Sequence, residues 1–200
     1  FFANTPDILP EYLQQGGRPA FLIRAALAAL TMPVYGIYSG FELCENAPVP
    51  GKEEYIDSEK YQFKGRDWNA PGNIKDYITR LNKIRSENRA LREYANLRTH
   101  TAENDQILCF SKSTPSLDNI LFIAATLDPR SNQSAFVHVP LEEFGIGADE
   151  EYAMEDLLTG EVFHWRGSRN FVALDPQNRP AHVFRVRRPI GREEGVDLFA

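Results

Sequence analysis

The sequence predicts an α/β segment followed by an all-β domain. Apolar, strand-like stretches at residues 1–3 and 33–40 flank a long apolar helical pattern, and beyond residue 103 the chain alternates short β-segments with turns. A strand, a helix and a second strand of these lengths form a βαβ unit, which implies a parallel sheet. Short strands at regular spacing predict an antiparallel sandwich or a small barrel. We therefore expect two units, residues 1–103 and residues 104–200.

The opening stretch combines an apolar run with a polar turn. The run stops at Asn4, and Thr5-Pro6-Asp7 follows at once. An α/β barrel delivers functional side chains to its C-terminal rim at strand ends of this kind. No cap or turn precedes Phe1, so we expect the chain to begin partway through a domain.

Two helices are predicted in the first unit. Ala20–Thr31 contains five alanines and is apolar on most sides, so it should be largely buried, and Pro33 ends it. Ile74–Tyr94 places its apolar residues on one face at helical spacing. Asn73 followed by Asp76 is similar to a capping box at its start.

The second unit contains the predicted β-segments, which turns such as Asp128-Pro129 and Asp175-Pro176 separate. These segments are Gln106–Lys112, Ile120–Leu127, Ser134–Val139, Glu151–Asp156, Glu161–Trp165, Asn170–Leu174 and His182–Val186.

A long irregular loop is predicted at residues 41–72. Compact domains seldom carry loops of this length without a use for them. The loop mixes charged and aromatic residues, including Lys60, Tyr61, Asp67 and Trp68, a combination typical of a sugar or phosphate site. A solvated excursion over the surface would have the same composition, so both interpretations stay open.

Composition excludes several classes of partner. A formal charge of −6 argues against nucleic-acid binding, and the densest basic group, Arg185, Arg187 and Arg188, is typical of an exposed edge strand. Cys44 and Cys109 share no metal-like spacing and fit a reducing cytoplasm. The longest apolar run is too short to cross a bilayer. We expect a cytoplasmic protein that binds neither nucleic acid nor a membrane.

Catalytic chemistry, if present, falls to carboxylates. The four histidines lack metal-ligand spacing, and Ser39 lacks the glycine context of a nucleophile elbow. Asp7 and Glu42 each follow a predicted strand, and cleavage of a glycosidic bond needs paired carboxylates. The alternative is that Asp7 caps the turn at Pro10 and that Glu42 pairs with an arginine.

Three stretches resemble glycoside hydrolase family 13, the α-amylase family. Phe2–Leu9 resembles its strand-seven signature, Pro33–Glu42 resembles strand eight, and Tyr77–Leu91 resembles the last barrel helix. The β-region is similar to the domain that follows the barrel. The resemblance implies the C-terminal part of a (β/α)8 TIM barrel, with strands 7 and 8 and their helices, followed by an antiparallel β-sandwich.

One subfamily resembles the chain more closely. Most family members carry Asn-His-Asp at the strand-seven motif, whereas this chain has Asn4-Thr5-Pro6-Asp7. Together with residues 54–62 and Arg66-Asp67-Trp68, this is similar to the α-1,4-glucan:maltose-1-phosphate maltosyltransferases. These bacterial enzymes of glycogen-like polymer synthesis transfer maltosyl units from α-maltose 1-phosphate to α-1,4-glucans, with retention.

The resemblance also implies roles for individual residues. Asp7 matches the transition-state stabiliser, and Asn4 precedes it at the barrel rim. Lys60 and Tyr61 match a donor-site loop that contacts sugar, whereas Glu42 matches a structural position. The nucleophile and the general acid belong to earlier strands that this sequence lacks, so we expect the 200 residues alone to be inactive. No metal or organic cofactor is implied.

Other functions stay open. An ordinary α-amylase-family hydrolase or a trehalose-forming enzyme would share the barrel motifs. A non-catalytic glucan-binding or subunit-contact module could use Trp165, Phe163 and Phe171 as a stacking surface, although strand aromatics are more often core residues. The sequence leaves open whether the protein forms a homodimer.

Overall fold

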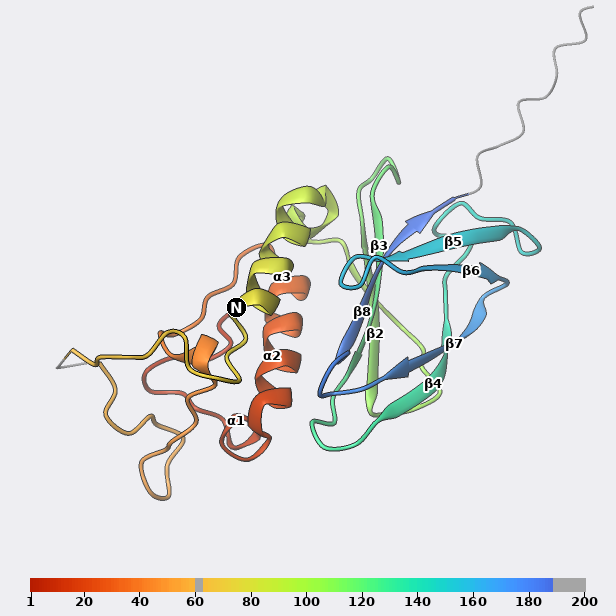
Figure 1. The fold of residues 1–200 in the computed structure, drawn as a ribbon. Coiled ribbons are helices and arrows are strands. Elements are labelled where there is room, and N and C mark those ends of the chain that lie inside the picture. Colours follow the sequence, from red (N-terminus) through yellow and green to blue (C-terminus); the bar gives the residue numbers. More distant parts are fainter. Residues whose placement is uncertain (60–62, 189–200) are drawn as a thin grey trace, which may run out of the picture.

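The computed structural model describes residues 1–59 and 63–188. This part of the chain forms three layers: a helical layer, a large antiparallel sheet, and a small second sheet (Figure 1). The helical layer contains α1 (Glu11–Gln15), α2 (Gly17–Thr31) and α3 (Lys75–Glu87), with short 3-10 turns at Phe41–Leu43 and Arg89–Arg92. No helix in these residues is long and apolar enough to cross a membrane.

The two sheets form a β-sandwich. In the described residues the larger sheet has the strand order β1-β2-β3-β8-β5-β6, and β4 pairs with β7 in the smaller one. The strands are β1 (Leu97–His100), β2 (Ile107–Ser113), β3 (Ile120–Thr126), β4 (Gln133–His138), β5 (Glu151–Asp156), β6 (Val162–Arg166), β7 (Arg169–Leu174) and β8 (Ala181–Arg187).

Strand β3 is buried on both faces. Leu121 and Ile123 belong to the apolar cluster beneath the helices, whereas Phe122 and Ala124 belong to the cluster between the two sheets. Successive side chains of a strand point to opposite faces, so a strand covered on both sides needs a continuous apolar run instead of an alternating one. This requirement explains the sequence of Ile120–Thr126, in which every residue is buried.

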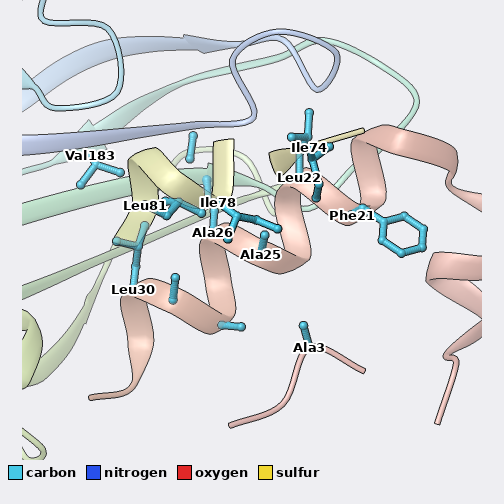
Figure 2. Close-up of a cluster of buried hydrophobic side chains, with 14 of the residues drawn as sticks. Ala3, Phe21, Leu22, Ala25, Ala26, Leu30, Ile74, Ile78, Leu81 and Val183 are labelled. Carbon is cyan, nitrogen blue, oxygen red and sulfur yellow. The ribbon is translucent and has the colours of Figure 1, made fainter. Parts of the chain in front are cut away.

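The helical layer and the sandwich share one hydrophobic core. Figure 2 shows Ala26 and Leu30 of α2 beside Ile78 and Leu81 of α3, with Val183 of β8 in the same cluster. The small alanine side chains of α2 allow the neighbouring elements to approach it closely. The helices therefore cover one face of the large sheet with apolar contacts.

Two cations close the C-terminal end of α2. Arg85 donates to the carbonyl oxygens of Met32 at 2.9 Å and Pro33 at 2.6 Å, and the Lys112 ammonium donates to that of Thr31 at 3.2 Å. Met32 and Pro33 directly follow α2, and Arg85 also donates to the Ala29 carbonyl within that helix. The last carbonyls of a helix, such as those of Ala29 and Thr31, lack partners within it and carry a partial negative charge, which these cations compensate. Lys112 is fully buried, and burial lowers its pKa. Lys112 thus connects β2 to the helical layer through a polar contact.

The sandwich prediction is confirmed. All seven predicted β-segments are present, and no end differs by more than one residue. Strand β1 was not predicted, since Leu97-Arg98-Thr99-His100 is mainly polar and forms one edge of the sheet. The division of the chain near residues 103 and 104 stays a prediction, with β1 on its N-terminal side.

The structure differs from the prediction in the first unit, residues 1–103. The two predicted strands are reduced to one parallel bridge between Phe2 and Gly36. The Gly36 N–H donates to the Phe1 carbonyl, and the Ala3 N–H donates to the Gly36 carbonyl, both at 2.9 Å. Pro33 cannot donate to a ladder, and glycine weakens a strand. Gly36 has a packing reason: a Cβ there would lie 2.5 Å from the Phe2 ring.

The second predicted helix also differs. It ends at Glu87 instead of Tyr94, because Asn88 adopts an extended conformation and its side chain donates to the Ile84 carbonyl at 2.7 Å. The capping-box prediction is wrong: the N-cap is Ile74, without a side-chain cap.

Candidate functional site

Asp7 lies at the tip of a closed turn. Thr5 and Ile8 exchange backbone hydrogen bonds of 3.1 and 3.2 Å, which leaves Pro6 and Asp7 at the tip. Proline suits the first tip position because its ring presets the backbone angle. The Asp7 side chain is exposed, so the turn holds a carboxylate at the surface in a defined place.

The segment after the turn is fixed by a neighbouring hairpin-like loop, residues 47–56. The Leu9 N–H donates to the Glu53 carbonyl at 2.6 Å, and the Tyr55 N–H donates to the Pro6 carbonyl at 3.3 Å. Glu53 also accepts from the first N–H of α1 through its side chain, at 3.0 Å. The first part of the long loop is therefore a support for the Asp7 turn.

Asn4 connects three segments. Its Nδ2 donates to the Tyr55 hydroxyl at 2.7 Å, and its Oδ1 accepts from the Tyr38 N–H at 2.8 Å. The residue is only 2% exposed. A buried amide with both ends bonded holds its neighbours in place, and leaving either end unpaired would cost free energy. These contacts are structural, and contact between Asn4 and a sugar stays a prediction.

Tyr38 and Tyr55 continue this network toward the second half of the loop. Their ring centroids lie 5.6 Å apart, and the Tyr38 hydroxyl accepts from the Glu59 N–H at 2.7 Å. Burial raises the pKa of Tyr55 to about 12, so its hydroxyl stays protonated at neutral pH. Asn4, the two tyrosines and Glu59 thus link the Asp7 segment to the loop.

Arg66 anchors the loop to the chain that precedes it. Its guanidinium, 3% exposed, contacts Glu45 at 3.0 Å and Glu59 at 2.8 Å, and donates to the Ser39 hydroxyl at 3.2 Å. Lys64 adds a 3.0 Å ion pair with Glu45. Burial disfavours the charge of Arg66, but the two carboxylates outweigh it and raise the pKa; hydrogen bonds from Arg66 and Lys64 lower the pKa of Glu59. The cluster holds Glu59 and Lys64, which come before and after residues 60–62 in the chain.

Gly40 and Glu42 lie shortly before Glu45 in the chain, and Gly40 packs against the Glu45 carboxylate. Gly40 has a φ of 97°, and a Cβ there would lie 2.5 Å from a Glu45 carboxylate oxygen. Glycine alone adopts this left-handed conformation without strain. Glu42 accepts from the Gly40 N–H at 3.2 Å, a contact that fits the structural position implied for it.

The predicted site residues thus have different outcomes. Asp7 and Asn4 lie on one short segment, whereas Lys60 and Tyr61 lie outside the described residues. In the sequence, Arg66 stands out only as part of a subfamily motif and Glu45 has no assigned role; their contact joins residues 21 positions apart.

The described residues contain no candidate metal site. Within residues 1–59 and 63–188, no group of three or more His, Cys, Asp or Glu is placed to hold a metal ion. Both cysteines are free thiols, and burial raises the pKa of Cys44 to about 11 and that of Cys109 to about 12. Neither is a reactive thiolate at neutral pH.

Comparison with known proteins gives a family match and curated relatives. Residues 99–186 match the family model described as "GLGE, C-terminal". The chain is 53% identical over 186 residues to the α-1,4-glucan:maltose-1-phosphate maltosyltransferase of Rhodospirillum rubrum. The aligned region covers 93% of this chain and 27% of that protein. The Pseudomonas aeruginosa protein of the same name is 50% identical over 94% of this chain and 28% of its own length. The chain therefore spans little more than a quarter of these relatives.

Solved structures with a similar fold include α-amylases. The Anoxybacillus enzyme matches with a TM-score of 0.63 at 15% identity, over 96% of this chain and 38% of that one. The Geobacillus thermoleovorans enzyme, complexed with acarbose, gives 0.59 at 15% identity, over 86% and 34%. At this identity the likeness concerns the fold alone. The curated relatives confirm the predicted resemblance: over nearly its whole length, this chain is similar to the C-terminal segment of the α-1,4-glucan:maltose-1-phosphate maltosyltransferases.

Proposed function

We propose that this chain is part of a retaining maltosyltransferase. The intact enzyme would transfer maltosyl units from α-maltose 1-phosphate to the 4-hydroxyl end of α-1,4-glucans, in the synthesis of a glycogen-like polymer in the bacterial cytoplasm. The observation that carries this proposal is the identity of 53% over 93% of the chain to a protein of that name. The exposed Asp7 carboxylate on its closed turn gives the proposal a chemical centre.

The first unit is proposed to complete a (β/α)8 barrel as strands 7 and 8. The parallel bridge between Phe2 and Gly36 supports this arrangement, as does α2 between the two segments. Phe1, Phe2 and Val34 are 50%, 64% and 74% exposed, which is costly for apolar side chains unless further barrel elements cover them. The α-amylase fold of the structural neighbours agrees with a barrel.

In the proposed reaction, an aspartate on an earlier strand attacks C1 of the maltosyl unit, and the C1–O bond to phosphate breaks. The glucan 4-hydroxyl then attacks C1 of the covalent intermediate while the general acid–base residue takes its proton, which releases the enzyme carboxylate. Asp7 would accept hydrogen bonds from the sugar hydroxyls, and these bonds strengthen as the ring distorts toward the transition state.

The donor sugar is proposed to contact Lys60 and Tyr61. The anchoring of Glu59 by Arg66 supports this role, because it fixes the chain beside these residues. Asn4 would act through its hold on Tyr38 and Tyr55, with direct sugar contact as a second possibility that its burial disfavours.

The test is an assay of the intact protein that contains this sequence. With α-maltose 1-phosphate and maltohexaose, we expect phosphate release together with products longer by two glucose units. Starch cleavage without phosphate release would favour an ordinary hydrolase, and trehalose formation would favour the trehalose-forming alternative. The 200-residue chain alone should release no phosphate, and measurable release by it would contradict the assignment of the nucleophile and acid to other strands.

The second candidate function is a glucan-binding module. The aromatic surface predicted for it does not exist as a set of three exposed side chains. Trp165 is 8% exposed inside the inter-sheet core, and Phe163 packs against Phe184 at 5.7 Å between ring centroids. Of the three predicted aromatics, only Phe171 is well exposed, at 55%. The predicted stacking surface of Trp165, Phe163 and Phe171 is therefore wrong as a set.

A further inference from the structure

An aromatic pair lies on the outer face of the small sheet. Phe136 of β4 and Phe171 of β7 are direct cross-strand partners, with ring centroids 5.5 Å apart and ring planes inclined at 68°. They are 36% and 55% exposed, whereas their neighbours Val137 and Val172 are buried in the inter-sheet core. Single exposed apolar residues are common, whereas two adjoining exposed rings form a small contiguous apolar patch.

A cavity of about 480 Å³ begins beside Phe171. Its walls come from the start of β4, the end of β7 and the turn at residues 175–179. Side chains with amide or hydroxyl groups line it: Asn132, Gln133, Ser134 and Asn178. An aromatic wall with a few polar groups around it is the usual composition of a small-molecule site.

The charged groups at this face are paired within the protein. Arg179 contacts Glu161 at 2.9 Å, and Asp175 accepts from the Asn178 amide at 2.7 Å. Arg169 lies over the Phe136 ring at 3.5 Å and donates to Glu103 at 2.7 Å. A charged ligand would have to compete with these pairs, so the face suits a neutral ligand.

The chemistry of the face selects a sugar. The Gln133 amide is bonded at both ends, to Asp128 and Asn104, and the Asn178 amide donates to Asp175. The Asn132 amide and the Ser134 hydroxyl carry the polar part of the site. A purely apolar partner would strip water from these two groups without replacing their hydrogen bonds, at a cost in free energy. A sugar ring instead offers a C–H face that packs on an aromatic ring and hydroxyls that bond to amides. We propose that Phe171 and the adjoining cavity bind an α-glucan chain, with Phe136, whose ring Arg169 covers, supporting the Phe171 ring from its side; the α-linkage rests on the proposed function.

This face lies apart from the Asp7 segment. Strands β4 and β7 lie beyond the large sheet, on the side opposite α2 and α3 (Figure 1). A polymer held there would raise the local concentration of acceptor ends without taking part in the chemistry.

The test uses the full 200-residue chain with two probes, maltoheptaose and cellohexaose, in isothermal titration calorimetry. Glycogen-affinity electrophoresis provides a second readout. We expect maltoheptaose to bind and glycogen to retard the chain. Phe171→Ala should weaken maltoheptaose binding about tenfold, as truncation of a central aromatic contact commonly does. Phe171→Trp should retain binding, because it restores the platform. Tyr94→Ala, at a 77% exposed aromatic outside the face, is the matched control and should bind as the unaltered chain does.

Circular dichroism checks that each variant is folded. Equal affinity of Phe171→Ala and the unaltered chain would overturn the proposal, as would binding of neither probe; the phosphate-release assay of the intact protein would still decide the proposed function. Binding of cellohexaose alone would overturn the α-glucan assignment. Concentration-dependent dimerisation that Phe171→Ala abolishes, without sugar binding, would identify the face as a contact between copies.

Discussion

The two cores of the molecule lie on opposite faces of the large sheet and differ in what they need. The inter-sheet core contains only residues of the β-region, whereas the other core combines α2 and α3 with residues of β3 and β8. The sandwich is therefore complete on one face and depends on the helices on the other. The Asp7 turn lies at the edge of the second core: Ala3 and Leu9, on either side of the turn, are fully buried in it, whereas backbone hydrogen bonds close the turn itself. Apolar burial therefore determines the fold and anchors the Asp7 segment, and polar contacts determine the conformation of the turn.

Separating the two regions should have the largest effect. A fragment of residues 104–200 would lack β1 and expose Leu121, Ile123 and Val183, which are fully buried in the whole chain. We expect this fragment to bind a hydrophobic dye and to unfold without a cooperative transition, as monitored by circular dichroism during heating. A sharp transition near that of the whole chain would show that the helices are dispensable.

A buried contact between a carboxylate and a histidine should have the next largest effect. Asp156 is fully buried and contacts His182 at 2.8 Å, and it also accepts backbone N–H bonds from Leu158 and Val183. Asp156→Ala would leave the His182 ring and two backbone N–H groups without this partner, which we expect to cost about 3–5 kcal/mol in urea unfolding at pH 7, since each buried polar group left unpaired costs about 1–3 kcal/mol. Glu87→Gln, an exposed change on α3, is the control and should cost little.

The same pair predicts a pH dependence. Burial disfavours the charged form of Asp156, but the hydrogen bonds from His182 and the backbone outweigh it and lower its pKa below the ordinary value of 3.8. A carboxylate whose pKa is lower in the folded state stabilises the protein above its unfolded pKa, and this stabilisation is lost as the pH falls through the folded pKa. The difference in unfolding free energy between the unaltered chain and Asp156→Ala should therefore shrink below about pH 4. A difference that stays constant down to about pH 2 would contradict this origin.

Asn4 should have a smaller effect on stability and a clearer one on the site. Asn4→Ala removes bonds to Tyr55 and Tyr38, and we expect a loss of about 1–3 kcal/mol in unfolding free energy. Because these bonds hold the Asp7 segment against the loop, limited proteolysis of residues 47–66 should become faster. Unchanged proteolysis together with the loss of stability would show that Asn4 does not position the loop.

The sandwich could be predicted from sequence because its information is local. Strands with apolar or alternating patterns between turn residues were located within one residue, as in Glu151–Asp156. Strand β1 lacked this signal, because an edge strand with exposed Arg98 and Thr99 needs no apolar pattern. The strand predicted around Gly36 is reduced to the single bridge that Gly36 forms with Phe2, and Pro33, which has no N–H, cannot extend the ladder.

The candidate site was predictable only in part. Asp7 was identified by its position after an apolar run and by family resemblance, both of which can be read from neighbouring residues. The supports of the site join residues far apart: Asn4 reaches Tyr55 across 51 positions, and Arg66 reaches Glu45 across 21. A single sequence carries no pattern for such pairs, so their roles required the structure.

The most direct test of the account is Asp7→Asn in the intact protein, assayed for phosphate release from α-maltose 1-phosphate with maltohexaose as acceptor. Asparagine keeps the size of the side chain but removes its charge, so hydrogen bonds that strengthen in the transition state would be weakened. We predict a fall in kcat of about 100- to 1,000-fold with an unchanged circular dichroism spectrum. Glu87→Gln should leave kcat unaltered. A kcat for Asp7→Asn equal to that of the unaltered enzyme would contradict the placement of Asp7 at the reacting sugar.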